Sequence, residues 1–164
     1  GGCQIVVKNK EGIISNSQIT LSGSLELIIF VPDKTTSTDQ ARTIIPDNIK
    51  LQDAVFNISR TALLVNSLNS NLTEYLKLAT EDQIHQPYRL KLIPGLDNII
   101  ETSINSGALG SFLCGSGPAI IALAKSNVAK ISENILQTAS QFNIKGQIIH
   151  SKPTNLGAHF PNNI

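Results

Sequence analysis

The sequence predicts an α+β fold whose main body is a split β-α-β unit. Apolar, β-branched runs bounded by glycine or proline alternate with longer stretches in which apolar residues recur at helical spacing. From Leu25 onward the expected order is strand, helices, strand, strand, helix, strand. A short glycine-rich segment, residues 115–118, joins the two middle strands. This order is typical of the ferredoxin-like fold, here with extra helices in the first crossover.

The composition indicates a globular chain that can bury a sizeable core. The chain has 164 residues, of which 41% are hydrophobic and 15% charged, and its formal net charge is +1. Because no basic or acidic block is present, we expect neither nucleic acid nor a membrane as the main partner. No apolar run approaches the length of a membrane span. The two cysteines, Cys3 and Cys114, form no disulfide framework and fit reduced thiols in the cytosol.

The beginning of the chain predicts two strands that lie outside the split β-α-β unit. Residues 4–8 form a β-rich run, residues 9–12 a turn, and residues 13–21 an edge strand that pairs back. The chain also contains no methionine. We therefore expect a fragment whose N-terminal part is missing. Residues 1–23 would close a preceding domain, and residues 24–164 would form the second one.

The elements of the main unit follow from hydrophobic spacing, capping residues and helix breakers. Pro32, Pro46 and Gly107 mark three of the ends. The expected elements are a strand at 25–31, helices at 39–45, 51–68, 72–80 and 95–105, strands on either side of 115–118, a helix at 127–142 and a strand at 144–150.

The helix at 51–68 has the clearest helical spacing of apolar residues, so one of its faces is expected to be buried. That face comprises Ala54, Val55, Ile58, Ala62, Val65 and Leu68.

The segment Gly115-Ser116-Gly117-Pro118 is the first candidate for a functional loop. Glycines permit positive φ angles and close approach of a ligand to the backbone, and successive N–H groups in such a turn can bind an anion. A plain hairpin turn between two core strands is the alternative. We expect the preceding Cys114 to be a small buried side chain rather than a nucleophile, because no His or carboxylate lies beside it in the sequence.

Two arginines are candidates for binding a carboxylate. Arg60 lies within the most apolar helix, where a guanidinium is costly unless it reaches a partner or solvent. Arg89 lies in a segment punctuated by prolines. If the two converge, they can bind one carboxylate through paired hydrogen bonds. Asn57, one helical turn before Arg60, is either a polar neighbour of the site or a solvated side chain. We expect His85 to be a satisfied imidazole rather than a catalytic base.

No complete nucleotide site is present in the sequence. The phosphate loop GxxxxGK[ST] does not occur, and the glycine segment lacks the third glycine of a dinucleotide fingerprint.

Several separated blocks carry motifs of one known family. The blocks are Pro32-Asp33 with Ser37-Thr38 and Ala41-Arg42, residues 53–60 (DAVFNISR), residues 85–89 (HQPYR) with 93–95 (IPG), residues 107–110 (GALG) with 115–118 (GSGP), and Gly157-Ala158. The glycine blocks resemble the third motif of the GHMP kinase superfamily. DAVFNISR and HQPYR together resemble the homoserine kinases within it. The resemblance covers most of the chain.

This resemblance implies ATP-dependent phosphorylation of L-homoserine to O-phospho-L-homoserine, on the way to threonine. It implies L-homoserine and ATP as partners, Mg²⁺ as a cofactor, and a cytoplasmic enzyme, with a plastid as the alternative; a homodimer is left open. The ATP loop, the Mg²⁺ ligands and the unknown catalytic residues would lie in a missing, ribosomal S5-like N-terminal half. The fragment alone is therefore expected to be inactive and to hold no metal.

Within this chain, the resemblance implies that Arg60 and Arg89 hold the substrate carboxylate, with Asn57 beside them. The loop Gly115, Ser116 and Gly117 would close over the active site from the other side. Two alternatives stay open at this point: another GHMP kinase that acts on a different small alcohol, and a non-catalytic ferredoxin-like module that binds an amino acid.

Overall fold

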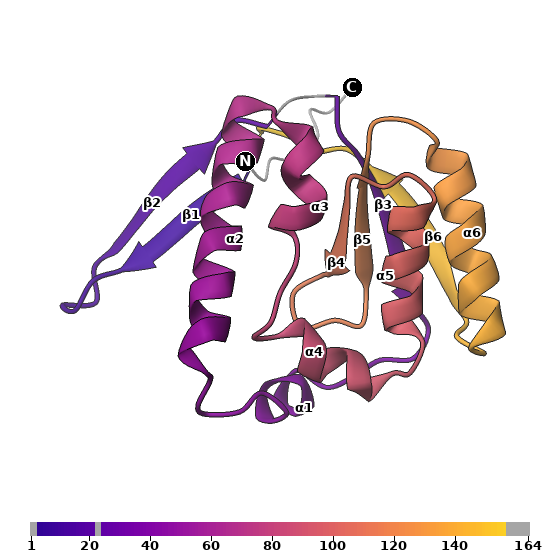
Figure 1. The fold of residues 1–164 in the computed structure, drawn as a ribbon, viewed down its shortest axis with the longest axis horizontal. Helices are drawn as coiled ribbons and strands as arrows, with labels where there is room; N and C mark the ends of the chain where they lie inside the picture. The colour runs from indigo at the N-terminus through magenta and orange to yellow at the C-terminus, as the bar shows by residue number, and fades with distance from the viewer. Residues whose placement is uncertain (1–2, 22–23, 157–164) are drawn as a thin grey trace, which may run out of the picture.

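The computed structural model describes residues 3–21 and 24–156 and contains two separate β-sheets (Figure 1). The smaller sheet consists of β1 (Cys3–Lys8) and β2 (Ile14–Ile19), which pair antiparallel. The backbone N–H of Gly12 donates to the carbonyl of Asn9 in the turn between them. The predicted edge strand therefore does pair back onto the first strand.

The larger sheet has the strand order of a split β-α-β unit. Its strands are β3 (Glu26–Pro32), β4 (Gly110–Leu113), β5 (Ile120–Ala124) and β6 (Gly146–Ser151). The order across the sheet is β4-β5-β3-β6, and all neighbouring strands are antiparallel. The first and third strands of the unit thus form the centre of the sheet. This arrangement confirms the predicted fold class.

The helices match the predicted segments to within a few residues. They are α1 (Thr38–Thr43), α2 (Leu51–Ser70), η1 (Thr73–Tyr75), α3 (Leu76–Ala79), α4 (Gln86–Arg89), η2 (Leu90–Leu92), α5 (Leu96–Asn105) and α6 (Val128–Gln141), where η marks a 3₁₀ turn. The helix predicted at 72–80 is divided into η1 and α3. The proline-punctuated segment after it contains two further short elements, α4 and η2.

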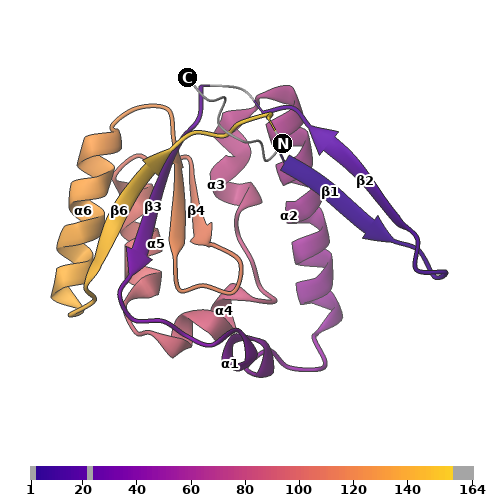
Figure 2. The ribbon, with the colours of Figure 1, turned by 180° about the vertical axis from the view of Figure 1, so that it is seen from behind.

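Helices cover both faces of the larger sheet (Figures 1 and 2). On one face, Ile28 and Phe30 of β3 pack in a single buried cluster with Ile99 of α5 and Ile131 of α6. On the other face, a smaller cluster joins β5 to α2 and α3. Helices α1 and α4 lie together near one end of the sheet, where the β4–β5 loop also lies.

The buried face predicted for α2 is wrong for most of its length. The side chains of Val55 and Ile58 are 57% and 69% exposed, and Ala62 is exposed as well. Only the C-terminal half of α2 packs on the sheet, through Leu64 and Leu68. The N-terminal half extends beyond the sheet. Within the described residues, its apolar side chains therefore have no sheet to pack against.

Cys114 is also exposed rather than buried. Strand β4 ends at Leu113, so Cys114 already belongs to the turn and points away from the core.

The predicted domain boundary falls at residues 22–23, outside the described residues, as does the Gly157-Ala158 block. The boundary therefore stays a prediction. Across residues 3–21 and 24–156, none of the helices combines the length and the apolar character needed to span a bilayer.

Candidate functional site

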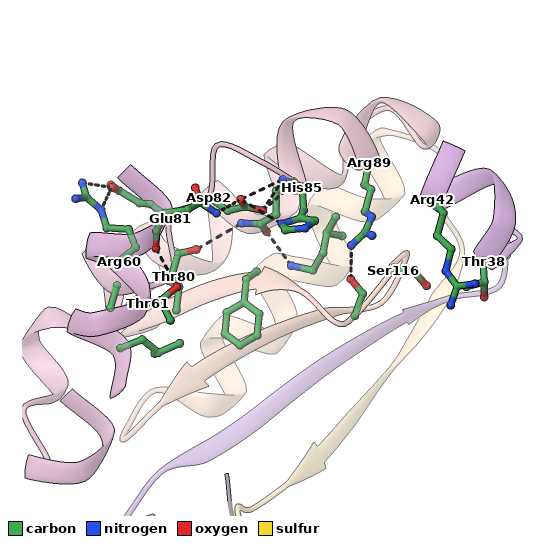
Figure 3. Close-up of a pocket in the computed structure, with 17 residues that line it drawn as sticks. Thr38, Arg42, Arg60, Thr61, Thr80, Glu81, Asp82, His85, Arg89 and Ser116 are labelled. Carbon is green, nitrogen blue, oxygen red and sulfur yellow. Dashed lines mark hydrogen bonds and ion pairs between the residues drawn. The ribbon is translucent and has the colours of Figure 1, made fainter. Parts of the chain in front are cut away.

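A cavity of about 600 Å³ opens near the end of the sheet where the β4–β5 loop meets α1, α2 and α4 (Figure 3). Five of the predicted site residues line it. They are Arg60, Arg89, Asn57, Gly115 and Ser116. Gly117, the sixth, lies outside the cavity wall. These residues come from α2, α4 and the β4–β5 loop, which are far apart in the sequence, and they share one concave surface.

Arg89 joins two distant segments at the cavity. Its Nη1 donates a hydrogen bond to the carbonyl of Gly115 at 3.1 Å, and its Nε donates to the carbonyl of Ala41 at 3.1 Å. The side chain therefore holds the end of α1 against the glycine loop. No carboxylate in the described part of the chain pairs with Arg89, so its charge is not neutralised there.

Arg60 has found a protein partner. Its Nη2 lies 2.9 Å from Oε2 of Glu81, and its Nε donates to the same oxygen at 3.2 Å. The guanidinium also lies over the ring of Phe56, 3.9 Å from the ring centroid. Its charge is thus compensated by Glu81, which accounts for a guanidinium in so apolar a helix.

Arg42 is a cavity residue that the sequence reasoning did not select. It lies in the last turn of α1 and lines the same cavity as Arg89. Its side chain forms no hydrogen bond or ion pair within residues 3–21 and 24–156. In Figure 3, Arg42 lies at the end with Thr38 and Ser116, whereas Arg60 lies at the opposite end beside Glu81. The sequence feature that could have pointed to Arg42 is its place in the Ala41-Arg42 motif block.

Asn57 lines the cavity, and its side chain is hydrogen-bonded to the protein rather than solvated. Its Nδ2 donates to Oδ1 of Asp82 at 2.7 Å, and its Oδ1 accepts from the N–H of Gln83 at 2.9 Å. Asn57 therefore ties the middle of α2 to the turn that precedes α4.

Asp82 is the second residue that the sequence reasoning missed. Its carboxylate accepts hydrogen bonds from the backbone N–H groups of residues 84–86. Partial burial acts to raise the pKa of Asp82. The hydrogen bonds from the Asn57 amide and from the three N–H groups outweigh that effect and lower the pKa below its ordinary value of 3.8. Asp is a usual N-cap residue, but the N-cap of α4 is His85, so this sequence pattern does not select Asp82.

His85 also lines the cavity, and its side chain is half exposed. Its Nδ1 lies 3.7 Å from Oδ1 of Asp82, too far for a hydrogen bond. No described residue is within hydrogen-bond distance of its ring to orient it as a base. His85 therefore lines the cavity and is given no catalytic role.

The glycine loop is a closed hairpin turn that also lines the cavity. Gly115 and Gly117 have φ angles of +58° and +81°, as the glycine pattern predicts. The N–H of Cys114 donates to the carbonyl of Ala119 at 2.8 Å, and the N–H of Gly117 donates to the carbonyl of Cys114 at 2.9 Å. Among the described residues, no group of three or more His, Cys, Asp or Glu side chains is placed to hold a metal ion.

Comparison with known proteins assigns the chain to a class. Residues 61–141 match the family described as GHMP kinases C terminal. The solved homoserine kinase of Cytophaga hutchinsonii superposes with a TM-score of 0.83 at 29% sequence identity, covering 90% of this chain and 48% of that one. Residues 61–141 therefore belong to the family of GHMP kinase C-terminal domains.

Within that class, curated homoserine kinases are similar to most of the chain. That of Caldicellulosiruptor saccharolyticus is 37% identical over 138 residues, which cover 84% of this chain and 45% of the relative. That of Aquifex aeolicus is 35% identical over 158 residues, which cover 96% of this chain and 53% of the relative. The chain matches a C-terminal portion of homoserine kinases and spans about half their length.

Proposed function

We propose that the protein carrying this chain transfers the γ-phosphoryl group of ATP to the side-chain hydroxyl of L-homoserine, giving O-phospho-L-homoserine and ADP. The observation that carries the proposal is a cavity in which Arg42 and Arg89, both without a carboxylate partner among the described residues, face the glycine loop. A small amino acid presents the carboxylate that such a pair binds. The names of the relatives support homoserine as that amino acid.

The contribution of this chain to the reaction is positioning. Phosphoryl transfer depends mainly on alignment of the attacking oxygen and on compensation of charge. A carboxylate held at one end of the cavity restricts where the substrate hydroxyl can lie. ATP, as the phosphoryl donor, and Mg²⁺, which would compensate phosphate charge, are expected from the family. The described residues offer no cluster of ligands for Mg²⁺, so none of them is assigned to the metal.

Arg89 is the central residue of the proposed carboxylate site. The sequence motifs pair Arg89 with Arg60. The structure offers Arg42 as an alternative second arginine for the same carboxylate. Arg42 is the stronger candidate on electrostatic grounds, because the charge of Arg60 is already compensated by Glu81. Asn57, Gly115 and Ser116, which line the cavity, complete the proposed substrate site, and Gly117 shapes the turn beside it.

Three single substitutions in the complete enzyme test this assignment: Arg42→Ala, Arg60→Ala and Arg89→Ala. Loss of one partner from a carboxylate–guanidinium pair that the bound substrate buries costs about 2–5 kcal/mol, which raises KM for homoserine roughly thirtyfold or more. We expect that increase for Arg89→Ala and Arg42→Ala and a smaller one for Arg60→Ala. Lys91→Ala, which removes a positive charge from η2 outside the cavity, is the matched control.

A second substrate separates loss of carboxylate binding from general damage. 3-Aminopropanol is homoserine without its carboxylate. The unaltered enzyme should strongly prefer homoserine, and Arg89→Ala should lose most of that preference, because its activity toward 3-aminopropanol should fall much less than its activity toward homoserine. If KM for homoserine is unchanged in all three arginine variants, the proposed carboxylate site is wrong. If neither compound is phosphorylated by the unaltered enzyme, the proposed reaction is wrong.

A further inference from the structure

The four-residue helix α4 depends on side chains from outside it for its position. A single helical turn is not stable by itself in water. His85, the residue that precedes α4, provides no side-chain hydrogen bond to its first N–H groups. The contacts that hold α4 must therefore come from other residues.

On the side of α2, Asp82 provides this contact. Its Oδ1 accepts from the N–H of Ile84 at 2.7 Å and its Oδ2 from the N–H of Gln86 at 2.7 Å, so it satisfies free donors at the start of α4. The same carboxylate accepts from Nδ2 of Asn57 in the middle of α2. Asp82 thus fixes the start of α4 to the middle of α2.

On the side of the cavity, two side chains of α4 contact the segment that contains the glycine loop. Oε1 of Gln86 accepts from the N–H of Leu113 at 2.9 Å, one residue before the turn begins. Arg89, one helical turn later, donates to the carbonyl of Gly115. A displacement of α4 would therefore move Arg89 and release the base of the loop together.

We propose that Asp82 is a positioning residue that, through α4, sets where Arg89 and the loop at 115–116 stand in the cavity. Asp82 is not proposed to bind the substrate, although it lines the cavity. Its two oxygens already accept five hydrogen bonds, and a carboxylate offers about four lone-pair sites. No acceptor position is left for a substrate amino group.

Amide hydrogen exchange in the complete protein tests the structural part of this proposal. In Asp82→Ala, exchange at the N–H of Leu113 should rise about tenfold or more, because its acceptor on Gln86 is displaced. Exchange at Ile135, buried in α6, should stay within about twofold. Asp82→Asn keeps the shape and one acceptor oxygen, so it should give an intermediate effect. Asp97→Ala removes a carboxylate from the first turn of α5 and should change neither reporter.

Steady-state kinetics of the same variants test the functional part, which rests on the proposed function. Displacement of Arg89 and the loop should lower kcat/KM for homoserine by about tenfold to a hundredfold in Asp82→Ala, with partial recovery in Asp82→Asn. Because Asp82 acts through the carboxylate site, activity toward 3-aminopropanol should fall less than activity toward homoserine.

The outcomes distinguish the two proposals. Unchanged exchange at Leu113 in both Asp82 variants would overturn the positioning role. A uniform rise at Leu113 and Ile135 would also overturn it, since it would show a general loss of stability. Faster exchange at Leu113 alone supports the positioning role, even if the unaltered enzyme does not phosphorylate homoserine, which would overturn only the proposed function.

Discussion

Two neighbouring carboxylates on the cavity wall have different roles because they have different neighbours. Glu81 lies beside Arg60 and compensates its charge. Asp82, the next residue, accepts hydrogen bonds from Asn57 and from the backbone of the following turn. Sequence alone does not separate these roles, because the partners on α2 are more than twenty positions away.

The lowered pKa of Asp82 predicts how stability depends on pH. A carboxyl whose pKa is lower in the folded than in the unfolded state stabilises the fold fully above its unfolded value, here 3.8. That contribution is lost as the pH falls through the lower, folded-state pKa. We expect the free energy of unfolding, measured by urea denaturation, to fall less between neutral pH and this acidic window in Asp82→Asn than in the unaltered protein. Asp97→Asn is the control, and equal losses in all three proteins would contradict the assignment.

At the scale of elements, the packing between α5 and α6 depends on a glycine. Gly95, immediately before α5, has a φ angle of +102°, and a Cβ there would lie 2.5 Å from Cγ of Phe142 at the end of α6. Gly115 also has a positive φ, but a Cβ there would meet nothing within 4 Å. The two positions therefore separate crowding from backbone strain.

Alanine substitutions at these glycines should differ in their effect on stability. Gly115→Ala carries only the cost of a left-handed backbone, about 1–2 kcal/mol. Gly95→Ala adds overpacking against Phe142, which costs about 1–3 kcal/mol more. The free energies of unfolding of the two variants, measured by chemical denaturation, should differ by that amount. Equal effects would show that Phe142 moves aside without cost.

The long helix shows where hydrophobic spacing succeeds and where it fails. The spacing predicts the existence and the ends of α2 correctly, because both depend on local sequence. It does not predict which part of the apolar stripe is covered, because this depends on how far α2 extends beyond the sheet. The exposed half of the stripe is a property of the tertiary arrangement.

A matched pair of isoleucines tests the corrected burial of α2. In this chain Ile58→Ala should change the free energy of unfolding by no more than about 0.5 kcal/mol, since the side chain is 69% exposed. Ile99→Ala, at a fully buried site in α5, should cost about 2–5 kcal/mol. A cost at Ile58 close to that at Ile99 would restore the buried face that the sequence predicts.

At the scale of the whole molecule, the strand order is predictable and the cavity is only partly so. The order of strands and helices from Leu25 onward limits the topology to a split β-α-β sheet. The structure shows this topology. Arg60, Arg89 and Asn57 were selected from motifs and do share a cavity. Arg42 lies in one of the motif blocks, but its place on the cavity wall depends on how α1 packs near Arg89. The role of Asp82 depends on contacts with α2 and α4 that no local pattern encodes.

The chain alone is expected to lack phosphoryl-transfer activity. It carries no phosphate loop, and its cavity presents residues proposed for the substrate carboxylate rather than for ATP. The measurement is formation of O-phospho-L-homoserine from ATP and homoserine by the purified 164-residue chain. Turnover by this chain would show that the nucleotide is bound by residues present here.

The two carbonyl contacts of Arg89 restrict which residue can replace it. A guanidinium has donors that point in several fixed directions, so one side chain can reach Ala41 and Gly115 and still present an N–H to a ligand. A lysine ammonium at the same position keeps the charge but cannot span both carbonyls in that geometry. Arginine would therefore remain the required residue even in a descendant protein that had exchanged its substrate for one with no carboxylate.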